Sequence, residues 1–233
     1  IYLTLCIIVN IYFLYILADS RWFFIIIIIN IALVRTGIRM RHIVKNGVKV
    51  TKDQYPDVYE CAIHLYKKMG LSSMPSIYIG SCADIPDAGT FNILIKDVVV
   101  LSPDVYKAAD AEGTETISWI ICHEFSHIQR HHLKWKILIA LGPAGGLPFL
   151  YKAYSRACEY NCDKTATHYC PMGAIWALFL GTGLKQESER HVDLTELIKQ
   201  ANNELNVWSW FSEIRSTHPH VRNRVKAVSK ALC

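Results

Sequence analysis

The chain has 233 residues, of which 52% are hydrophobic and only 19% charged, and its formal net charge is +5. This length is enough for one folded domain with additional membrane helices, and the apolar composition is typical of a membrane-associated protein. Basic residues do not form a dense run interleaved with aromatic side chains, so the sequence gives little support for nucleic-acid binding.

Two apolar stretches dominate the N-terminus, residues 1–17 and 22–34, and a polar turn, Asp19–Arg21, separates them. A helix that crosses a bilayer core needs about 20 apolar residues, with about 17 as the lower limit. The second stretch is shorter, but Arg35 and Arg39 can snorkel and extend it. We therefore predict a transmembrane helical hairpin over residues 1–35. A secretory signal peptide is the alternative, and the second apolar stretch argues against it.

Basic residues crowd the segment after this hairpin, whereas the turn between its helices holds only Arg21; they are Arg35, Arg39, Arg41, Lys45, Lys49 and Lys52. The positive-inside rule then places the turn outside the cell and the rest of the chain in the cytoplasm. We predict a basic cytoplasmic linker at 36–52 and a catalytic domain at 53–233, on the cytoplasmic side of the cell (inner) membrane.

A mixture of helix and strand patterns follows. Pro56 is placed to start a helix and Gly70 to end it, and apolar residues form a stripe between them. The segments SIYIG, FNILI and DVVVL read as short strands, with turns at Asp87–Gly89 and Lys96–Asp97. A further helix begins at Thr114. The predicted fold class is α+β and mostly helical, with a small sheet.

The segment HEFSH lies on this last helix. His123 and His127 are four residues apart, so they project from one helical face, and Glu124 lies beside them. An HExxH sequence on a helix binds zinc through two imidazoles, while the glutamate handles protons. The surrounding residues are apolar, and two neutral buried histidines need a polar partner. A metal is one such partner, and hydrogen-bonded core histidines are the alternative.

A catalytic zinc usually takes three protein ligands. The segment SRACEYNCD offers Glu159 as the third ligand, and Asp163, one helical turn later, can hydrogen-bond the free ring nitrogen of a ligating histidine. The alternative for Glu159 and Asp163 is that they form a solvated acidic face. His131 is an alternative third ligand. Cys158 and Cys162, also one turn apart, could share a metal or pack as small apolar side chains.

Three segments together, HEFSH, SRACEYNCD and STHPHVRNRV, resemble the HtpX family of membrane-bound zinc metallopeptidases, relatives of the CAAX prenyl endoproteases. The resemblance implies a zincin-type domain with one zinc ion per chain, bound by His123, His127 and Glu159. It also draws attention to the Thr217–Pro219 segment and to Arg224. DAGTFN resembles the family's segment before the active-site helix and implicates Ala88, Gly89, Thr90 and Phe91 in substrate binding.

The predicted reaction assigns a role to each of these side chains. Glu124 takes a proton from the attacking water and passes it to the leaving amine. His218 or Arg224 stabilises the oxyanion, although Arg224 lies beside an apolar stripe and a merely solvated arginine is the alternative. The substrate adds as a strand to an exposed sheet edge, for which the AGTFNILI strand is the candidate.

Residues 137–151 are too few for one membrane span and include two prolines and three glycines. We predict a re-entrant or interfacial hairpin there, with a buried loop as the alternative.

The predicted function is a membrane-anchored zinc metalloendopeptidase in contact with a lipid bilayer and a polypeptide substrate. The family resemblance implies damaged or misassembled membrane proteins as substrates. The alternatives are a CAAX-type prenyl protease, a non-catalytic zinc-binding scaffold and a small-molecule metallohydrolase. Glu124 argues against the scaffold, because a structural site needs no base.

Overall fold

A computed structural model of the chain describes residues 27, 30–31, 34–35, 37–38, 41–42, 44–80, 88–93, 96–111, 113–131, 148–180, 196, 199 and 207–232. The chain divides into two compact units, Ile1–Lys45 and Asn46–Cys233. Most of the predicted transmembrane hairpin, 1–35, lies outside the described residues. Among the described residues, no helix has both the length and the apolar character needed to cross a membrane.

The second unit contains a mixed four-stranded sheet, in agreement with the predicted small sheet. Its strands lie in the order β1-β2-β4-β3. The pair β2–β4 is parallel, and the pairs β1–β2 and β3–β4 are antiparallel. In the part of the chain that the structure describes, β3 is an edge strand, as the sequence predicted. The strands are β1 (Val48–Lys49), β2 (Ser76–Ile79), β3 (Ala88–Ile93) and β4 (Lys96–Leu101).

The strand boundaries differ from the predicted ones in two places. β1 lies in the stretch 36–52, predicted as a linker, so the sheet begins before Asp53. Ala88–Gly89 and Lys96–Asp97, predicted as turns, belong to β3 and β4, where Ala88 pairs with Leu101 and Lys96 with Ile93. Pairing with a neighbouring strand imposes an extended backbone on Ala88–Gly89 and Lys96–Asp97, although these residue types are uncommon in strands. In β1 the alternation of Val48, Lys49 and Val50 does favour a strand, and the basic residues around it led to its prediction as a linker.

Helices make up most of the rest of the second unit. Pro56 occupies the first turn of its helix and Gly70 has a left-handed φ of 66°, which confirms the predicted start and stop signals. The predicted helix start at Thr114 is also confirmed. The helices are α3 (Pro56–Lys68), α4 (Pro103–Ala111), α5 (Thr114–Gln129), α7 (Pro148–Tyr169), the 3₁₀ turn η1 (Pro171–Gly173), α8 (Ala174–Leu180), α11 (Val207–Ile214) and α12 (Val221–Leu232).

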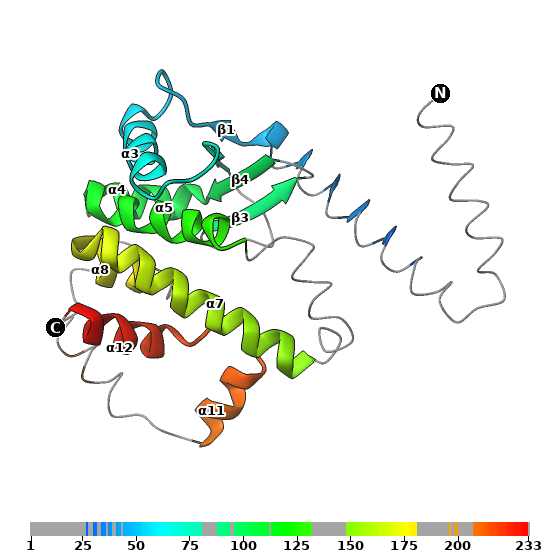
Figure 1. Cartoon of the computed structure of the whole chain (residues 1–233), viewed down its shortest axis with the longest axis vertical. Coiled ribbons are helices and arrows are strands. Elements are labelled where there is room, and N and C mark those ends of the chain that lie inside the picture. The colour runs from blue at the N-terminus through cyan, green and yellow to red at the C-terminus, as the bar shows by residue number, and fades with distance from the viewer. Residues whose placement is uncertain are drawn as a thin grey trace. The chain divides into compact units, whose positions relative to one another are not determined.

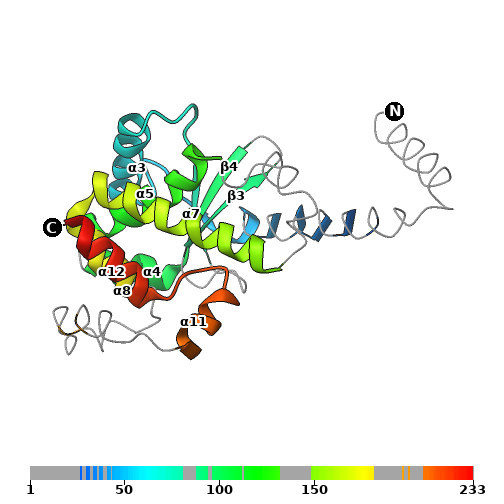
Figure 2. The same ribbon diagram turned by 60° about the horizontal axis from the view of Figure 1, so that its bottom comes forward.

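The helix α5 lies at the centre of the unit. It contacts β3, α3, α4 and α7 (Figure 1), and α7 runs beside it in the rotated view as well (Figure 2). Ile121 and Phe125 on α5 are fully buried. Because α5 is enclosed on several sides, its polar residues must find partners on the elements that cover it.

The helix α7 begins at Pro148, so residues 148–151 are helical and do not belong to the hairpin predicted at 137–151. Proline is favoured in the first turn of a helix, where its missing N–H costs nothing. Residues 137–147 lie outside the described part of the chain.

Candidate metal centre

Two turns of α5 present the imidazoles of His123 and His127 on one face, with ring centroids 5.1 Å apart. His123 is buried, and Trp119, one turn earlier, stacks on its ring at a centroid distance of 5.4 Å. The indole N–H of Trp119 donates a hydrogen bond of 3.1 Å to Thr167 on α7. The ring of His123 is therefore packed against a side chain that is itself fixed to the neighbouring helix.

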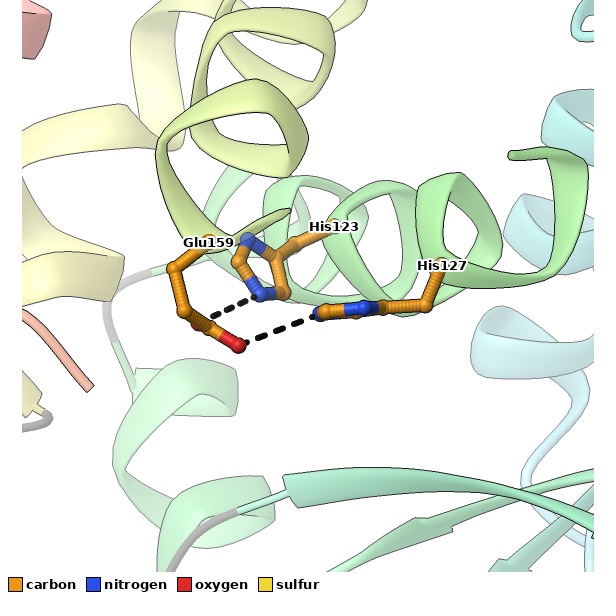
Figure 3. Close-up of side chains that lie close together, drawn as sticks. All are labelled: His123, His127 and Glu159. Atoms are coloured by element: carbon orange, nitrogen blue, oxygen red, sulfur yellow. Dashed lines mark ion pairs between the residues drawn. The ribbon is translucent and has the colours of Figure 1, made fainter. Parts of the chain in front are cut away.

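Glu159 on α7 points at both imidazoles (Figure 3). Its carboxylate oxygens Oε2 and Oε1 lie 3.4 Å from Nε2 of His123 and 3.4 Å from Nε2 of His127, respectively. These distances are long for charge-assisted hydrogen bonds. Each is close to the separation of about 3.3–3.4 Å between two donors of a tetrahedral zinc ion with bonds of about 2.0–2.1 Å, and each involves a different oxygen of Glu159. The three donor atoms lie within 4.8 Å of one another, so the set fits one divalent metal ion.

Asp163, one turn after Glu159 on α7, reaches the other ring nitrogen of His123. Its Oδ1 lies 3.0 Å from Nδ1 without forming a hydrogen bond. The contact is on the ring nitrogen that does not face Glu159, so Nε2 is the nitrogen directed at the donor cluster. Both Glu159 and Asp163 are buried, which excludes the solvated acidic face considered from the sequence.

Arg224 on α12 forms a two-pronged ion pair with Asp163. Its Nε donates to Oδ2 at 2.8 Å and its Nη2 to Oδ1 at 2.6 Å, and Nη2 is also 3.7 Å from Glu159. Only 15% of the Arg224 side chain is exposed, so the solvated alternative does not describe it. The guanidinium positions Asp163, a contact that the sequence analysis missed.

Burial and charge act against each other in this cluster. Burial disfavours the charged form of His123, but its contacts with Asp163 and Glu159 outweigh this and raise its pKa to about 10. Burial likewise opposes ionisation of Glu159, yet His123 and His127 hold the pKa of this carboxyl well below its usual range. Without a metal, His123 therefore carries a proton that a metal ion must displace.

Glu124 lies next to His123 in sequence, but it is not one of the three clustered donors. Its side chain is buried, and its Oε2 accepts a hydrogen bond of 2.5 Å from the Thr90 hydroxyl on β3. The same hydroxyl lies 3.1 Å from the backbone oxygen of Glu124. Thr90 was predicted from the sequence as a substrate-binding residue, and its contact with Glu124 was not predicted.

His218 lies at the open side of the cluster. Its side chain is 66% exposed, and its Nε2 is 3.7 Å from Oε1 of Glu159. The segment before it is anchored to α7, because Nη1 of Arg156 lies 3.0, 3.2 and 2.9 Å from the carbonyl oxygens of residues 213, 214 and 216. Exposed and close to the donors, His218 is better placed than Arg224 to meet a substrate.

Other residues considered from the sequence lie apart from the donor set. The helix α5 ends at Gln129, so His131 is not on it; His131 is exposed and has a left-handed φ of 58°. Cys158 and Cys162 are buried on α7, in agreement with their alternative as small apolar side chains. Ala88, Gly89 and Phe91 lie on β3 with Thr90, at the edge of the sheet next to α5.

Comparison with known proteins gives one family match. Residues 135–232 match the model of Peptidase family M48. The matched stretch includes Glu159, Asp163, His218 and Arg224 and begins after α5. No curated protein and no solved structure matches the chain. The family match supports a metallopeptidase function, with which the cluster of His123, His127 and Glu159 is compatible.

Proposed function

We propose that this protein is a membrane-anchored zinc metalloendopeptidase of the HtpX-like type. One observation carries the proposal: three donors spaced for a single ion lie beside a buried carboxylate, Glu124, that is not one of them. A structural metal site needs no such neighbour. A hydrolytic site does, because a base must take a proton from the attacking water.

Each side chain of the site has a separate role in the proposed reaction. His123, His127 and Glu159 would hold the zinc, which when bound acidifies the attacking water and polarises the scissile carbonyl. Glu124 accepts the proton of the water and delivers it to the leaving amine. His218 donates a hydrogen bond to the oxyanion, the role that its exposed position beside Glu159 suits.

A peptide substrate would bind along β3. This strand pairs with β4 on one side, and in the described part of the chain no strand pairs with its other side. An extended peptide that adds to such an edge gains backbone hydrogen bonds with little dependence on its sequence. Because α5 packs against β3, a peptide bound along β3 would lie close to the metal ligands.

The membrane anchor and the quality-control role rest on the sequence. The apolar N-terminus and the basic residues after it support two spans with the catalytic domain in the cytoplasm, and Ile31, Val34 and Ile38 are exposed. The HtpX resemblance supports misfolded membrane proteins as substrates. A reporter fused to the C-terminus should be cytoplasmic and one inserted at Asp19–Arg21 external. The opposite labelling would reject this topology.

The central experiment measures metal content and casein cleavage on one purified preparation. We expect about one zinc per chain, cleavage that a chelator abolishes, and recovery on adding zinc back. Cleavage that persists without metal would reject the proposed function.

The variant Glu159→Gln tests the third ligand. It should bind zinc more weakly and lose activity, because a neutral amide replaces an anionic ligand. Metal affinity equal to that of the wild type would remove Glu159 from the ligand set.

A further inference from the structure

We infer that Thr90 is a positioning residue for the general base: its hydroxyl fixes Oε2 of Glu124 and leaves Oε1 as the oxygen that takes the proton from water. The inference rests on the proposed function and assigns to β3 a role in the reaction besides peptide binding.

The hydroxyl of Thr90 has a single proton, and two oxygens of Glu124 lie near it. The Thr90 oxygen lies 2.5 Å from Oε2 of Glu124 and 3.1 Å from the backbone oxygen of the same residue. A hydroxyl has one proton to donate, and the shorter distance is typical of an O–H group bound to a carboxylate oxygen. The proton is therefore shared with the carboxylate, and the backbone oxygen is at most a weak second acceptor.

Both residues of this contact are buried. The Thr90 residue is 9% exposed and Glu124 is 6% exposed. A buried carboxylate requires donors to replace the water it has lost. In the described part of the chain, the Thr90 hydroxyl donates a hydrogen bond to this carboxylate. Threonine is also stiff about χ1, because it branches at Cβ, so it holds its hydroxyl in a defined direction.

Thr90 lies within β3, the strand proposed to bind the peptide. Side chains alternate along a strand, so the Thr90 side chain can face α5 while the backbone of the same strand is available to a peptide. The strand thus links the position of the bound peptide to that of the base. Removal of the hydroxyl should therefore disturb proton transfer and leave peptide binding almost unchanged.

The test compares Thr90→Val, which keeps the shape and removes the hydroxyl, with Thr90→Ser, which keeps the hydroxyl. We expect Thr90→Val to lower kcat by roughly ten- to a hundredfold, as misplacement of a catalytic group does, with KM and zinc content close to the wild-type values. Thr90→Ser should recover most of kcat. The matched control is Thr116→Val, another buried threonine, two turns before Glu124 on α5, which should keep the wild-type kcat.

A second measurement does not depend on activity. Melting temperatures of the zinc-loaded wild type, Thr90→Val, Glu124→Ala and the double variant form a double-mutant cycle. The Thr90→Val shift should shrink when Glu124 is absent, because the hydrogen bond is then already lost. Strictly additive shifts, or an unchanged kcat in Thr90→Val when the wild type is active, would overturn the inference. A wild type without peptidase activity would reject the proposed function instead, and the cycle would still decide whether Thr90 holds Glu124.

Discussion

The two sides of α5 hold their carboxylates in different ways. On the α7 side, Glu159 contacts two histidines and lies within 4 Å of His218 and Arg224, while Asp163 joins His123 to Arg224. On the β3 side, the structure describes one hydrogen bond to the Glu124 side chain, from Thr90. The proposed metal-binding side is thus a network of charges, whereas the proposed base accepts its hydrogen bond from a neutral hydroxyl.

This difference agrees with the roles proposed for the two sides, metal binding beside α7 and proton transfer beside β3. Buried charges are costly unless several partners compensate them, and four charged or ionisable groups, from α5, α12 and the segment between α11 and α12, do so around Glu159 and Asp163. A base must remain able to accept a proton, and a strong ion pair would oppose this. We therefore expect substitutions on the two sides to have distinct signatures, with metal affinity affected on one side and turnover on the other.

The largest effect that we expect is that of Glu124→Gln on turnover. The amide keeps the shape of the side chain and cannot act as a base, so peptide cleavage should fall by about a hundred- to ten-thousandfold. Zinc content and melting temperature should stay near the wild-type values, and the variant should retain unfolded substrate. Turnover and zinc are to be measured on one preparation. Wild-type turnover with zinc bound would reject Glu124 as the base.

The next effect is that of Asp163→Asn on metal affinity. This change leaves Arg224 buried beside a neutral amide and weakens the contact that orients His123. Loss of such an outer partner typically lowers metal affinity by about 10- to 100-fold. Competition with a chromophoric chelator would measure it, with Thr90→Val as the control from the other side of α5. Equal affinities in the wild type and Asp163→Asn would contradict the distinction between the two sides.

A smaller effect is expected at the start of α5, where a substitution should lower the stability of the fold without changing the reaction. Gly173 in η1 packs against the start of α5, where an added Cβ would collide with the backbone of Glu115 and Thr116. We expect Gly173→Ala to destabilise the fold by about 1–3 kcal/mol, as overpacking does, with activity per folded molecule preserved. In Gly37→Ala, the matched control, the added Cβ meets nothing within 4 Å. Equal melting temperatures for the two variants would show that η1 can shift away from α5.

The sequence could predict which residues share a face of one helix, but not which distant elements come into contact. The spacing of His123 and His127, and of Glu159 and Asp163, follows from the helical repeat, so each pair could be assigned to one face of its own helix. That Glu159 comes to lie opposite the histidines was implied by family resemblance and not by spacing. His131 shows the limit of the helical repeat, because α5 ends at Gln129. The contacts of Thr90 with Glu124 and of Arg224 with Asp163 join residues 34 and 61 positions apart, and no local pattern encodes them.

The last effect that we expect is a pH dependence confined to the metal-free protein, with no counterpart in the zinc-loaded enzyme. Folding raises the pKa of His123 from about 6.5 to about 10, because Asp163 and Glu159 favour its charged form. A raised pKa stabilises the fold fully below the unfolded value and ceases to do so as pH rises through the folded value. The carboxyls have lowered pKa values, so their contributions are constant above about pH 5. The metal-free protein should therefore lose stability between about pH 6.5 and 10, by at most about 1.4 kcal/mol per pH unit for one proton.

The zinc-loaded protein should not show this loss, because His123 then binds the metal as a neutral imidazole and has no proton to release. Melting temperatures of both forms at pH 6, 7, 8 and 9 would measure the difference, with metal-free His123→Gln as the control that removes the titrating ring. The slope of that variant gives the contribution of all other groups, including the cysteines. If the metal-free wild type and His123→Gln have the same slope, His123 does not carry the proton, and the charge network on the α7 side is weaker than its distances imply.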